Sequence, residues 1–219
     1  MTNIILLGAP GSGKGTQAQR IYAAYALPQI STGDLLSDAY RDGTYLGLRA
    51  QEYRSRGELV PDEITNQLAF ESLSRADCRD GFVLDGYPRT VDQARVLDQF
   101  LNSNGKSLDA VISIHCPDDL LIARVTSRRI CKECKIVYGL EVRPKKEDVC
   151  DCNGELYRRK DDNPDIFRAR LPVYYSKTFP LIELYQQRSG IFHQVDGTVS
   201  VDAIFAVISK IIGKDQRTA

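Results

Sequence analysis

The sequence has no net charge and no long hydrophobic run. Its 29 Lys and Arg residues equal its 29 Asp and Glu residues, so no overall positive field would hold nucleic acid or an anionic membrane surface. Its longest apolar runs, such as 4–7 and 203–208, are far shorter than the about 20 residues that a membrane-spanning helix needs. No internal repeat or low-complexity segment is visible. These absences exclude a membrane-spanning protein and a repeat protein, and any anion must be bound locally.

The N-terminal segment also lacks the charged region and the cleavage site of a secretion signal. We therefore expect a soluble, cytoplasmic protein with neither a membrane nor a nucleic acid as partner. The chain has 219 residues, of which 42% are hydrophobic and 26% are charged. These values predict one domain, or one domain that carries an insertion.

Short apolar runs alternate with stretches that are compatible with helices. Residues Asn3–Gly8 form an apolar run that ends at glycine, which is typical of a buried parallel strand. Similar runs occur at 82–84, 110–114 and 191–195. Helices are predicted at 14–25, 33–41, 45–55, 62–75, 91–102, 118–127, 164–187 and 201–212. This alternation predicts an α/β fold with a parallel sheet.

The alternation breaks at one segment, residues 128–160. This segment has ten Lys or Arg residues against six Asp or Glu residues, whereas 61–123 has five against eleven. It also contains four of the six cysteines, whereas Cys78 and Cys116 stand alone in apolar surroundings, where inert buried thiols are expected. We interpret 128–160 as part of a small, cationic, inserted subdomain.

Residues 8–14 read GAPGSGK, which matches the GxxxxGK spacing of a phosphate-binding loop between a strand and a helix. Glycines in such a loop let backbone N–H groups converge on phosphate oxygens, and the lysine reaches the outer phosphates. The motif predicts a site for a nucleoside triphosphate, the alternative being a glycine-rich turn with a solvated lysine. Because Gly15 follows Lys14 where Ser or Thr usually meets Mg²⁺, Thr16 is the candidate for that contact, directly or through water.

Arginines are grouped around the insertion. Residues 85–90 read DGYPRT, Arg128 and Arg129 open the insertion, 158–162 read RRKDD, and Arg170 lies on the following predicted helix. Each arginine alone is more simply a surface ion pair. Phosphoryl transfer, however, needs dispersed positive charge around the moving group, and the grouping favours that interpretation.

With these motifs together, the sequence resembles the adenylate kinase family from about residue 3 to 212. The stretches that carry the resemblance are GAPGSGKGTQ at 8–17, STGDLL at 31–36, GELVPDE at 57–63, DGYPRT at 85–90, RRICKEC at 128–134, RRKDD at 158–162 and VDGT at 195–198. The resemblance implies a P-loop nucleoside monophosphate kinase fold, with a five-stranded parallel sheet, helices on both faces and an inserted lid. It also implies the reaction of Mg²⁺-ATP with AMP to give two ADP, and a long lid of this kind argues against the uridylate and cytidylate kinases.

The resemblance divides the chain into three parts and assigns residues to each substrate. Residues 1–125 would form the core with an AMP-binding flap at about 31–60, residues 126–167 the lid, and residues 168–219 the rest of the core. The ATP-binding residues would be Gly11, Ser12, Gly13, Lys14, Gly15, Thr16, Arg124, Arg128, Val137, Tyr138, Gly197 and Val199. The AMP-binding residues would be Thr32, Glu58, Leu59, Val60, Gly86, Tyr87, Pro88, Arg89, Gln93, Arg159 and Arg170.

The same resemblance implies that catalysis depends on Lys14, Arg89, Arg128, Arg159 and Arg170, with Asp85 ordering Mg²⁺ through water. For some of the AMP-binding residues a purely structural role is the alternative. Gln93 would then only cap polar surface, and Leu59 and Val60 would simply belong to the core. The histidines, His115 and His193, receive no role.

The sequence departs from the family at one position. The family usually has an arginine three residues after the aspartate of STGD, where this chain has Ser37. Arg41 lies one helical turn further along the same face and is a candidate to bind AMP instead. A solvated surface arginine is an equal alternative.

The cysteine cluster is close to a zinc pattern. Cys131 and Cys134 are followed after fifteen residues by Cys150 and Cys152, and the second pair is one residue shorter than the C-x2-C spacing. Some adenylate kinases carry a structural zinc in the lid, so a structural Zn²⁺ held by four thiolates is predicted. The alternatives are an empty lid held by hydrogen bonds and a disulfide, which a reducing cytoplasm disfavours.

Two other functions are consistent with the motifs. One is a regulatory nucleotide switch whose zinc module contacts RNA or a partner, supported only by the basic bias of 128–160 and weakened by the few aromatic residues there. The other is a different monophosphate kinase. The expected partners remain ATP, AMP and ADP, and a monomer suffices for this chemistry.

Overall fold

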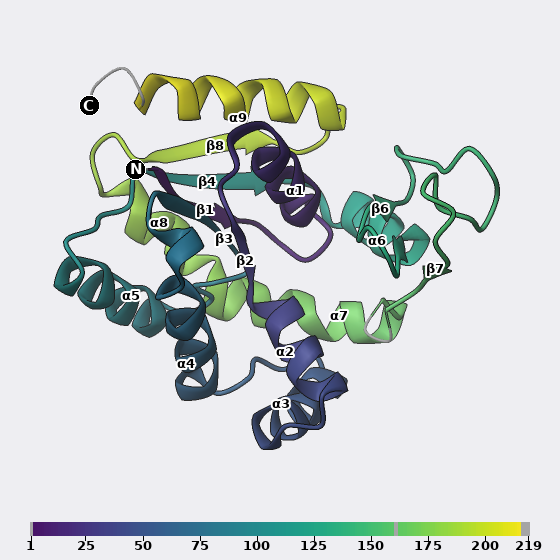
Figure 1. Cartoon of the computed structure of the whole chain (residues 1–219), viewed down its shortest axis with the longest axis horizontal. Coiled ribbons are helices and arrows are strands. Elements are labelled where there is room, and N and C mark those ends of the chain that lie inside the picture. The colour runs from purple at the N-terminus through teal and green to yellow at the C-terminus, as the bar shows by residue number, and fades with distance from the viewer. Residues whose placement is uncertain (1, 160–161, 216–219) are drawn as a thin grey trace.

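The computed structural model describes residues 2–159 and 162–215, and its central layer is a five-stranded parallel sheet (Figure 1). The strand order is β2-β3-β1-β4-β8. The strands are β1 (Thr2–Leu7), β2 (Gln29–Ser31), β3 (Gly81–Asp85), β4 (Ala110–His115) and β8 (Phe192–Asp196). The chain runs from β1 to β2 on one side of the sheet and from β4 to β8 on the other. The crevice at the carboxyl ends of such strands is where a ligand binds in an open α/β sheet, and the predicted fold class is confirmed.

Side chains of β1 alternate between two apolar cores. Ile4 and Leu6 pack with α1 (Lys14–Tyr25), α6 (Asp118–Ser127) and α9 (Val201–Asp215) on one face of the sheet. Ile5 and Leu7 pack on the other face, with helices α4 (Asp62–Leu73), α5 (Val91–Ser103) and α8 (Pro180–Gln186). Every residue of β1 is buried, as expected for a parallel strand covered on both faces.

Two segments of the chain extend away from the main sheet at its carboxyl edge. The first is a helical hairpin of α2 (Thr32–Arg41) and α3 (Tyr45–Ser55). The second is a three-stranded antiparallel sheet of order β6-β5-β7, made of β5 (Arg129–Cys131), β6 (Val137–Tyr138) and β7 (Leu156–Tyr157). In Figure 1 the hairpin hangs below the main sheet and the small sheet lies to its right, with α7 (Pro164–Val173) running between them.

Two elements differ from the sequence-based expectations. The fifth strand, β2, was not among the predicted apolar runs, because only Ile30 of its three residues is buried and apolar. The helix predicted at 164–187 is divided into α7, a π-helix (Tyr174–Thr178) and α8, and a short 3-10 helix (Ala76–Cys78) extends the region after α4. Pro180 has no N–H to continue the ladder, and Phe179 N–H bonds the carbonyl of Tyr174, five residues back, at 2.9 Å.

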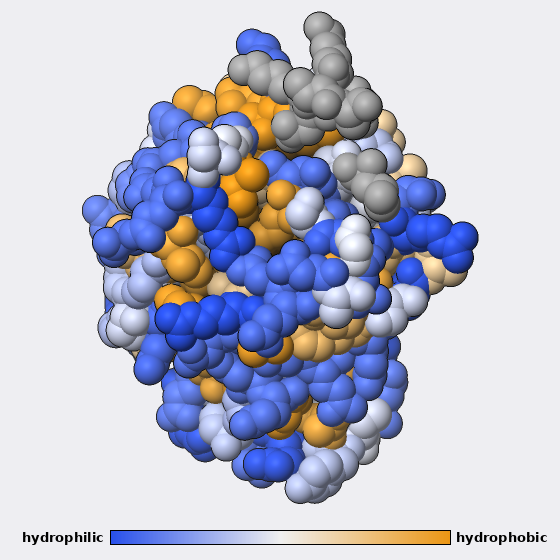
Figure 2. All heavy atoms as spheres, turned by 90° about the vertical axis from the view of Figure 1, so that its left-hand side faces the viewer, coloured by the Kyte–Doolittle hydropathy of each residue, from blue (hydrophilic) through white to orange (hydrophobic). Residues whose placement is uncertain are grey.

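One face of the molecule is predominantly polar. Figure 2 shows a face covered mostly by hydrophilic residues, with hydrophobic residues gathered near the top, beside α9. Within residues 2–159 and 162–215, no helix combines the length and apolarity required to cross a bilayer. Cys78 and Cys116 are buried, as predicted, with exposed fractions of 1% and 5%.

Helices α2 and α3 approach each other closely at Gly47. A Cβ added there would lie 2.1 Å from the carbonyl carbon of Ala39, which is far below van der Waals contact. Ala50, one turn further along α3, is fully buried at the same contact. Small residues on this face therefore set the distance between the two helices.

We expect Gly47→Ala to lower the free energy of unfolding by about 1 kcal/mol or more, because overpacking against backbone outweighs the gain in helix propensity. Chemical denaturation would measure the change, and limited proteolysis in the connection 42–44 should become faster. The exposed Leu48→Ala on the same helix, expected to change stability by about 0.5 kcal/mol or less, is the control. Equal stabilities for the two variants would show that the helices do not depend on close approach at Gly47.

Candidate functional site

A cavity of about 1060 Å³ lies at the carboxyl edge of the main sheet, between the phosphate loop, the α2–α3 hairpin, the small sheet and α7. Its lining is strongly cationic. The described lining residues include five carboxylates and eleven cations, which are Lys14, Arg41, Arg54, Arg89, Arg124, Arg128, Lys132, Lys135, Arg158, Arg159 and Arg170. In a chain with no net charge, this concentration marks the cavity as a site for a polyanion.

The loop 8–14 has the geometry of an anion cradle. Gly8, Gly11 and Gly13 have φ angles of 145°, 85° and 100°, which L side chains rarely adopt. The helix α1 begins at Lys14, so its positive dipole end faces the cavity. The ammonium of Lys14 donates hydrogen bonds to the carbonyls of Gly8, at 2.7 Å, and Ala9, at 2.9 Å. The loop is thus held in shape by the residue that would meet the phosphates.

The buried position of Lys14 and the charges around it lower its pKa. Desolvation at the base of the cavity lowers its pKa from 10.5 to about 8, and the guanidinium groups of Arg89, Arg170 and Arg128 act in the same direction. The carboxylate of Asp85 opposes this effect. An anion that bound beside Lys14 would therefore stabilise the charged ammonium and raise its pKa.

Asp85 stands at the end of β3, facing the start of α1. Desolvation raises its pKa, and the charge of Lys14 opposes that rise. Its Oδ2 accepts a hydrogen bond from the side-chain amide of Gln29, at 2.9 Å. A Cβ at Gly15 would lie 3.3 Å from the same oxygen, so a larger residue there would press on the carboxylate. This contact gives a physical reason for glycine after Lys14, and Thr16 lines the cavity beside it.

A second end of the cavity is built from α2 and the segment after β3. Thr32 Oγ1 and Arg89 Nε both donate to the carbonyl of Gly86, at 2.8 Å and 2.7 Å. The side chain of Gln93 accepts from the backbone N–H of Arg89, at 2.6 Å, and donates to Asp62, at 2.7 Å. Hydrogen bonds thus fix both the backbone and the side chain of Arg89.

Arginines of the inserted segment and of α6 are held by ion pairs. Within the insertion, Arg128 pairs with the fully buried Asp162, and Arg124, on α6, pairs with Glu141 of the insertion. Arg159 reaches from the insertion to Asp34, in the first turn of α2, at 2.6 Å. The last two pairs join the insertion to α6 and to α2 through charge. Lys160 and Asp161 of the RRKDD motif lie outside the described residues.

Most of the residues proposed from the sequence line this one cavity. They are Gly11, Ser12, Gly13, Lys14, Gly15, Thr16, Thr32, Arg41, Glu58, Leu59, Val60, Asp85, Gly86, Arg89, Gln93, Arg124, Arg128, Val137, Tyr138, Arg159 and Arg170. The fold therefore brings together residues that are spread between positions 11 and 170 of the sequence.

Four of the proposed residues do not line it. Tyr87 is fully buried, and its hydroxyl donates to Asn66 at 2.7 Å. Pro88 lines a neighbouring cavity of about 80 Å³. Gly197 packs against Cys116, where a Cβ would lie 2.3 Å from the sulfur, and Val199 is 40% exposed. Their contribution would be to shape the walls behind the cavity.

Among the cavity residues that were not anticipated from the sequence, two make hydrogen bonds that shape the site. Arg54, on α3, lines the cavity and donates to the hydroxyl of Ser37 at 3.0 Å. Gln29, which bonds Asp85, is on the short strand that the apolar pattern missed. Neither lies in a recognisable motif, and only the packing of the elements reveals them.

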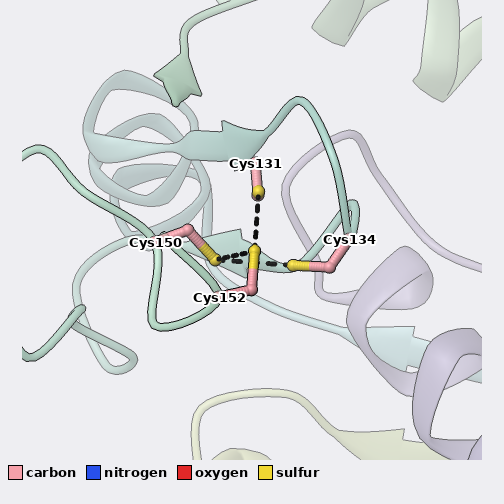
Figure 3. A group of neighbouring side chains, drawn as sticks. All are labelled: Cys131, Cys134, Cys150 and Cys152. Atoms are coloured by element: carbon pink, nitrogen blue, oxygen red, sulfur yellow. Dashed lines mark hydrogen bonds between the residues drawn. The ribbon is translucent and has the colours of Figure 1, made fainter. Parts of the chain in front are cut away.

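The four clustered cysteines converge in the inserted segment (Figure 3). Their sulfur atoms all lie within 4.8 Å of one another. The closest pairs are Cys134 with Cys150 and Cys150 with Cys152, both at 3.4 Å, and Cys131 with Cys152 at 3.6 Å. Four thiolates around a tetrahedral zinc, with Zn–S bonds of about 2.3 Å, would be about 3.8 Å apart. The cluster fits such an ion, and Cys152 belongs to it despite the short spacing.

A tight turn brings the second cysteine pair together. Asn153 has a φ of 67°, and hydrogen bonds from Asn153 N to Cys150 O, at 2.8 Å, and from Cys150 N to Gly154 O, at 3.0 Å, close the turn. A Cβ at Gly154 would lie 2.6 Å from the sulfur of Cys131. The hydroxyl of Tyr138 lies 3.3 Å from the sulfur of Cys150 and lowers the pKa of that thiol to about 6. Cys150 is therefore suited to act as a thiolate ligand.

The comparisons with known proteins agree on the adenylate kinase family. The family model described as "Adenylate kinase" matches residues 6–190. The chain is 47% identical over 214 residues to an adenylate kinase of Archaeoglobus fulgidus, which covers 97% of this chain and 98% of that protein. It is 46% identical over 213 residues to an adenylate kinase of Geobacillus sp. (strain WCH70), with 96% and 98% covered, and 44% identical over 215 residues to one of Clostridium botulinum, with 97% and 99% covered.

We expect Lys14→Met to reduce the affinity for a nucleoside triphosphate by roughly 10- to 150-fold, the effect of losing a hydrogen bond to a charged group. The fold should survive, because below pH 8 the wild-type chain carries the cost of a desolvated ammonium that Met does not have. Calorimetric titration and thermal melting at pH 7 would measure both.

The pH dependence gives an internal control. The folded-state pKa of Lys14 is depressed, so its destabilising effect is fully present below about pH 8 and is lost as pH rises toward 10.5. The melting temperature of the wild type should therefore rise relative to that of the variant as pH increases from about 8 toward 10.5. A difference between the two that stays constant over this range would contradict this description of Lys14.

Proposed function

This chain belongs to the adenylate kinase family, and we propose that it catalyses reversible transfer of a phosphoryl group from Mg²⁺-ATP to AMP, giving two ADP. One observation carries the proposal: a single cationic cavity has a phosphate loop at one end and the Thr32–Arg89 corner at the other. The cationic residues Arg128, Arg159 and Arg170 line the same cavity. That arrangement suits two nucleotides whose phosphates meet in the middle.

The donor nucleotide would occupy the phosphate-loop end. The loop N–H groups and Lys14 would bind its phosphates, and Arg124 of α6 and Arg128 of the inserted segment would close on them. Val137 and Tyr138 would lie near its base. Gly197 and Val199, which do not line the cavity, would contribute only through backbone that packs behind it.

The acceptor would occupy the other end. Thr32 and the segment 58–60 would face its nucleoside, and Arg89, Arg159 and Arg170 would bind its phosphate. Gln93 is fixed by Asp62 and the backbone of Arg89, so we assign it a bracing role there. Tyr87 and Pro88 support the same corner from behind.

The chemistry needs alignment and charge more than it needs a proton acceptor. A phosphate monoester has a second pKa near 6, so the acceptor is mostly dianionic at neutral pH and already nucleophilic. Lys14 and the arginines would neutralise the charge that develops on the transferred group. Mg²⁺, when bound, would neutralise further charge on the donor phosphates, and the oxygens of Asp85 and Thr16 are the donors that this ion prefers.

We propose that the inserted segment, residues 126–167, acts as a lid and residues 31–60 as an acceptor flap on a core formed by 1–125 and 168–219. The pair between Arg159 and Asp34 supports a closed arrangement in which both arms meet over the cavity. Closure would exclude water, which would otherwise hydrolyse ATP.

We infer that Cys131, Cys134, Cys150 and Cys152 hold a structural Zn²⁺. The mutual sulfur distances support a tetrahedral site, and four thiolates leave no open position for a water molecule. A reducing compartment keeps such cysteines from forming disulfides, and we propose a cytoplasmic location. One chain supplies the whole cavity lining, so a monomer suffices.

In a coupled assay that offers ATP with AMP, CMP, UMP and GMP separately, we expect AMP to be the preferred acceptor. The long lid and the STGDLL, GELVPDE and DGYPRT matches support this choice. Phosphorylation of UMP or CMP at an equal or higher rate would contradict the substrate assignment, and the absence of any transfer would contradict the reaction.

Removal of zinc with a strong chelator, or the Cys150→Ser substitution, should lower the melting temperature and increase proteolysis between 128 and 160. The metal cross-links a segment that buries little of its own apolar surface, so its binding energy is folding energy. Activity at low temperature should largely survive. Cys78→Ala, whose sulfur lies outside the cluster, should remain as sensitive to chelator as the wild type.

Elemental analysis of protein purified without added metal checks the zinc assignment directly. About one zinc per chain is expected for four thiolate ligands. Far less than this, with no gain in melting temperature on adding zinc, would contradict it.

A further inference from the structure

We propose that Arg54, on α3, binds the phosphate group of the acceptor nucleotide, and so supplies the positive charge that Ser37 on α2 cannot. This inference rests on the proposed function, because it assigns a residue to the acceptor end of the same cavity. Arg54 belongs to neither the phosphate loop nor the DGYPRT and RRKDD motifs, and no comparison assigns it a role.

The contact between Arg54 and Ser37 defines the position of the guanidinium. Nη1 of Arg54 donates to the Ser37 hydroxyl at 3.0 Å, and that hydroxyl donates in turn to the carbonyl of Gly33 at 2.7 Å. Both side chains are partly buried, and both line the large cavity with Thr32 and Arg89. The small serine therefore leaves the guanidinium of Arg54 in the space beside α2 that a longer side chain at 37 would occupy.

The close packing of α3 on α2 directs Arg54 to this position. Gly47 and Ala50 face α2, and Gly47 has no room for a Cβ. Arg54 follows Ala50 by four residues, on the same face of the helix. Gln51 and Ser55, its neighbours on α3, also line the cavity, so this end of α3 forms part of the acceptor wall.

The other arginines of the hairpin have surface partners. Arg41 is 65% exposed at its side chain and pairs with Asp38 at 2.7 Å and with Asp42 at 3.4 Å. Arg49 is exposed and stacks over the ring of Tyr45. Arg56 is exposed and pairs with Glu58. Among the described partners of these arginines, Ser37 is less exposed than Asp38, Asp42, Tyr45 and Glu58, which favours Arg54 over Arg41 for the phosphate.

Charge balance at this wall supports the same assignment. The cavity-facing residues of α2 include Asp34 and Asp38, and the only cation within the helix is Arg41 at its end. Asp34 pairs with Arg159 and Asp38 pairs with Arg41, so α2 itself offers no unmatched positive charge to an acceptor phosphate with a charge near −2. A guanidinium from α3 would supply that charge, and its planar, multiple N–H donors suit a phosphate better than a single ammonium would.

The test is to compare Arg54→Ala with Arg49→Ala, a matched control on the same helix that lies outside the cavity lining. Binding of AMP without ATP, measured by calorimetry, should weaken roughly tenfold or more in Arg54→Ala, as expected for one lost charge-assisted hydrogen bond. In steady-state kinetics the Michaelis constant for AMP should rise similarly, with that for ATP within about twofold, and Arg49→Ala should match the wild type.

A swap variant separates a phosphate contact from a purely structural one. Adding Ser37→Arg to Arg54→Ala should restore AMP affinity to within a fewfold of the wild type, since the guanidinium then comes from α2. Arg54→Lys should lie between Arg54→Ala and the wild type. Melting temperatures measured in parallel should be similar for all folded variants.

The outcomes are distinguishable. Wild-type protein that phosphorylates no monophosphate would overturn the proposed function itself. An active wild type with unchanged AMP affinity in Arg54→Ala would overturn only the role of Arg54. A large loss in Arg41→Ala together with none in Arg54→Ala would assign the phosphate to Arg41 and overturn the inference. Equal losses for ATP and AMP would indicate a structural role for Arg54 and also overturn it.

Discussion

The concentration of positive charge in one cavity is the constraint on which the rest of the structure depends. Burial lowers the pKa of the Lys14 ammonium, and the guanidinium groups of Arg89, Arg170 and Arg128 lie close enough to lower it further. Such a group of cations is unfavourable without counter-charges, because like charges repel in a region of low effective dielectric. Phosphates would supply them in the working protein. In the nucleotide-free chain the carboxylates that face the cavity do so, including Asp85 beside Lys14.

Carboxylates also hold the arginines that we assign to the nucleotides. Asp34, on α2, pairs with Arg159 of the inserted segment and so joins the two arms that leave the sheet, whereas the buried Asp162 pairs with Arg128 within the inserted segment. A bound phosphate would compete for the same guanidinium groups, so nucleotide binding and the closure of lid and flap would be coupled through exchange of partners. In the proposed function, the cysteine cluster would keep this part of the inserted segment ordered during that exchange.

Much of the fold was predictable because its signals are local. The apolar run before GAPGSGK, the glycines with positive φ, and the break in alternation at 128–160 all lie within short windows. Convergence of the four cysteines also followed from their spacing. The role of Arg54 was not predictable, because it depends on how closely Gly47 lets α3 approach α2. The π-helix before Pro180 was missed for a similar reason, since periodicity alone does not show where a proline interrupts the hydrogen bonds.

The pKa of Lys14, measured by NMR on the isotopically labelled side chain with and without ATP, tests the central claim most directly. The account predicts a value of about 8 in the free protein and a clear rise when the triphosphate supplies the missing negative charge. It also predicts that ATP affinity falls as pH increases above about 8, where the free ammonium loses its proton. A pKa near 10.5 in the free protein, unchanged by ATP, would contradict the claim that the cavity is a buried cationic site that binds phosphate.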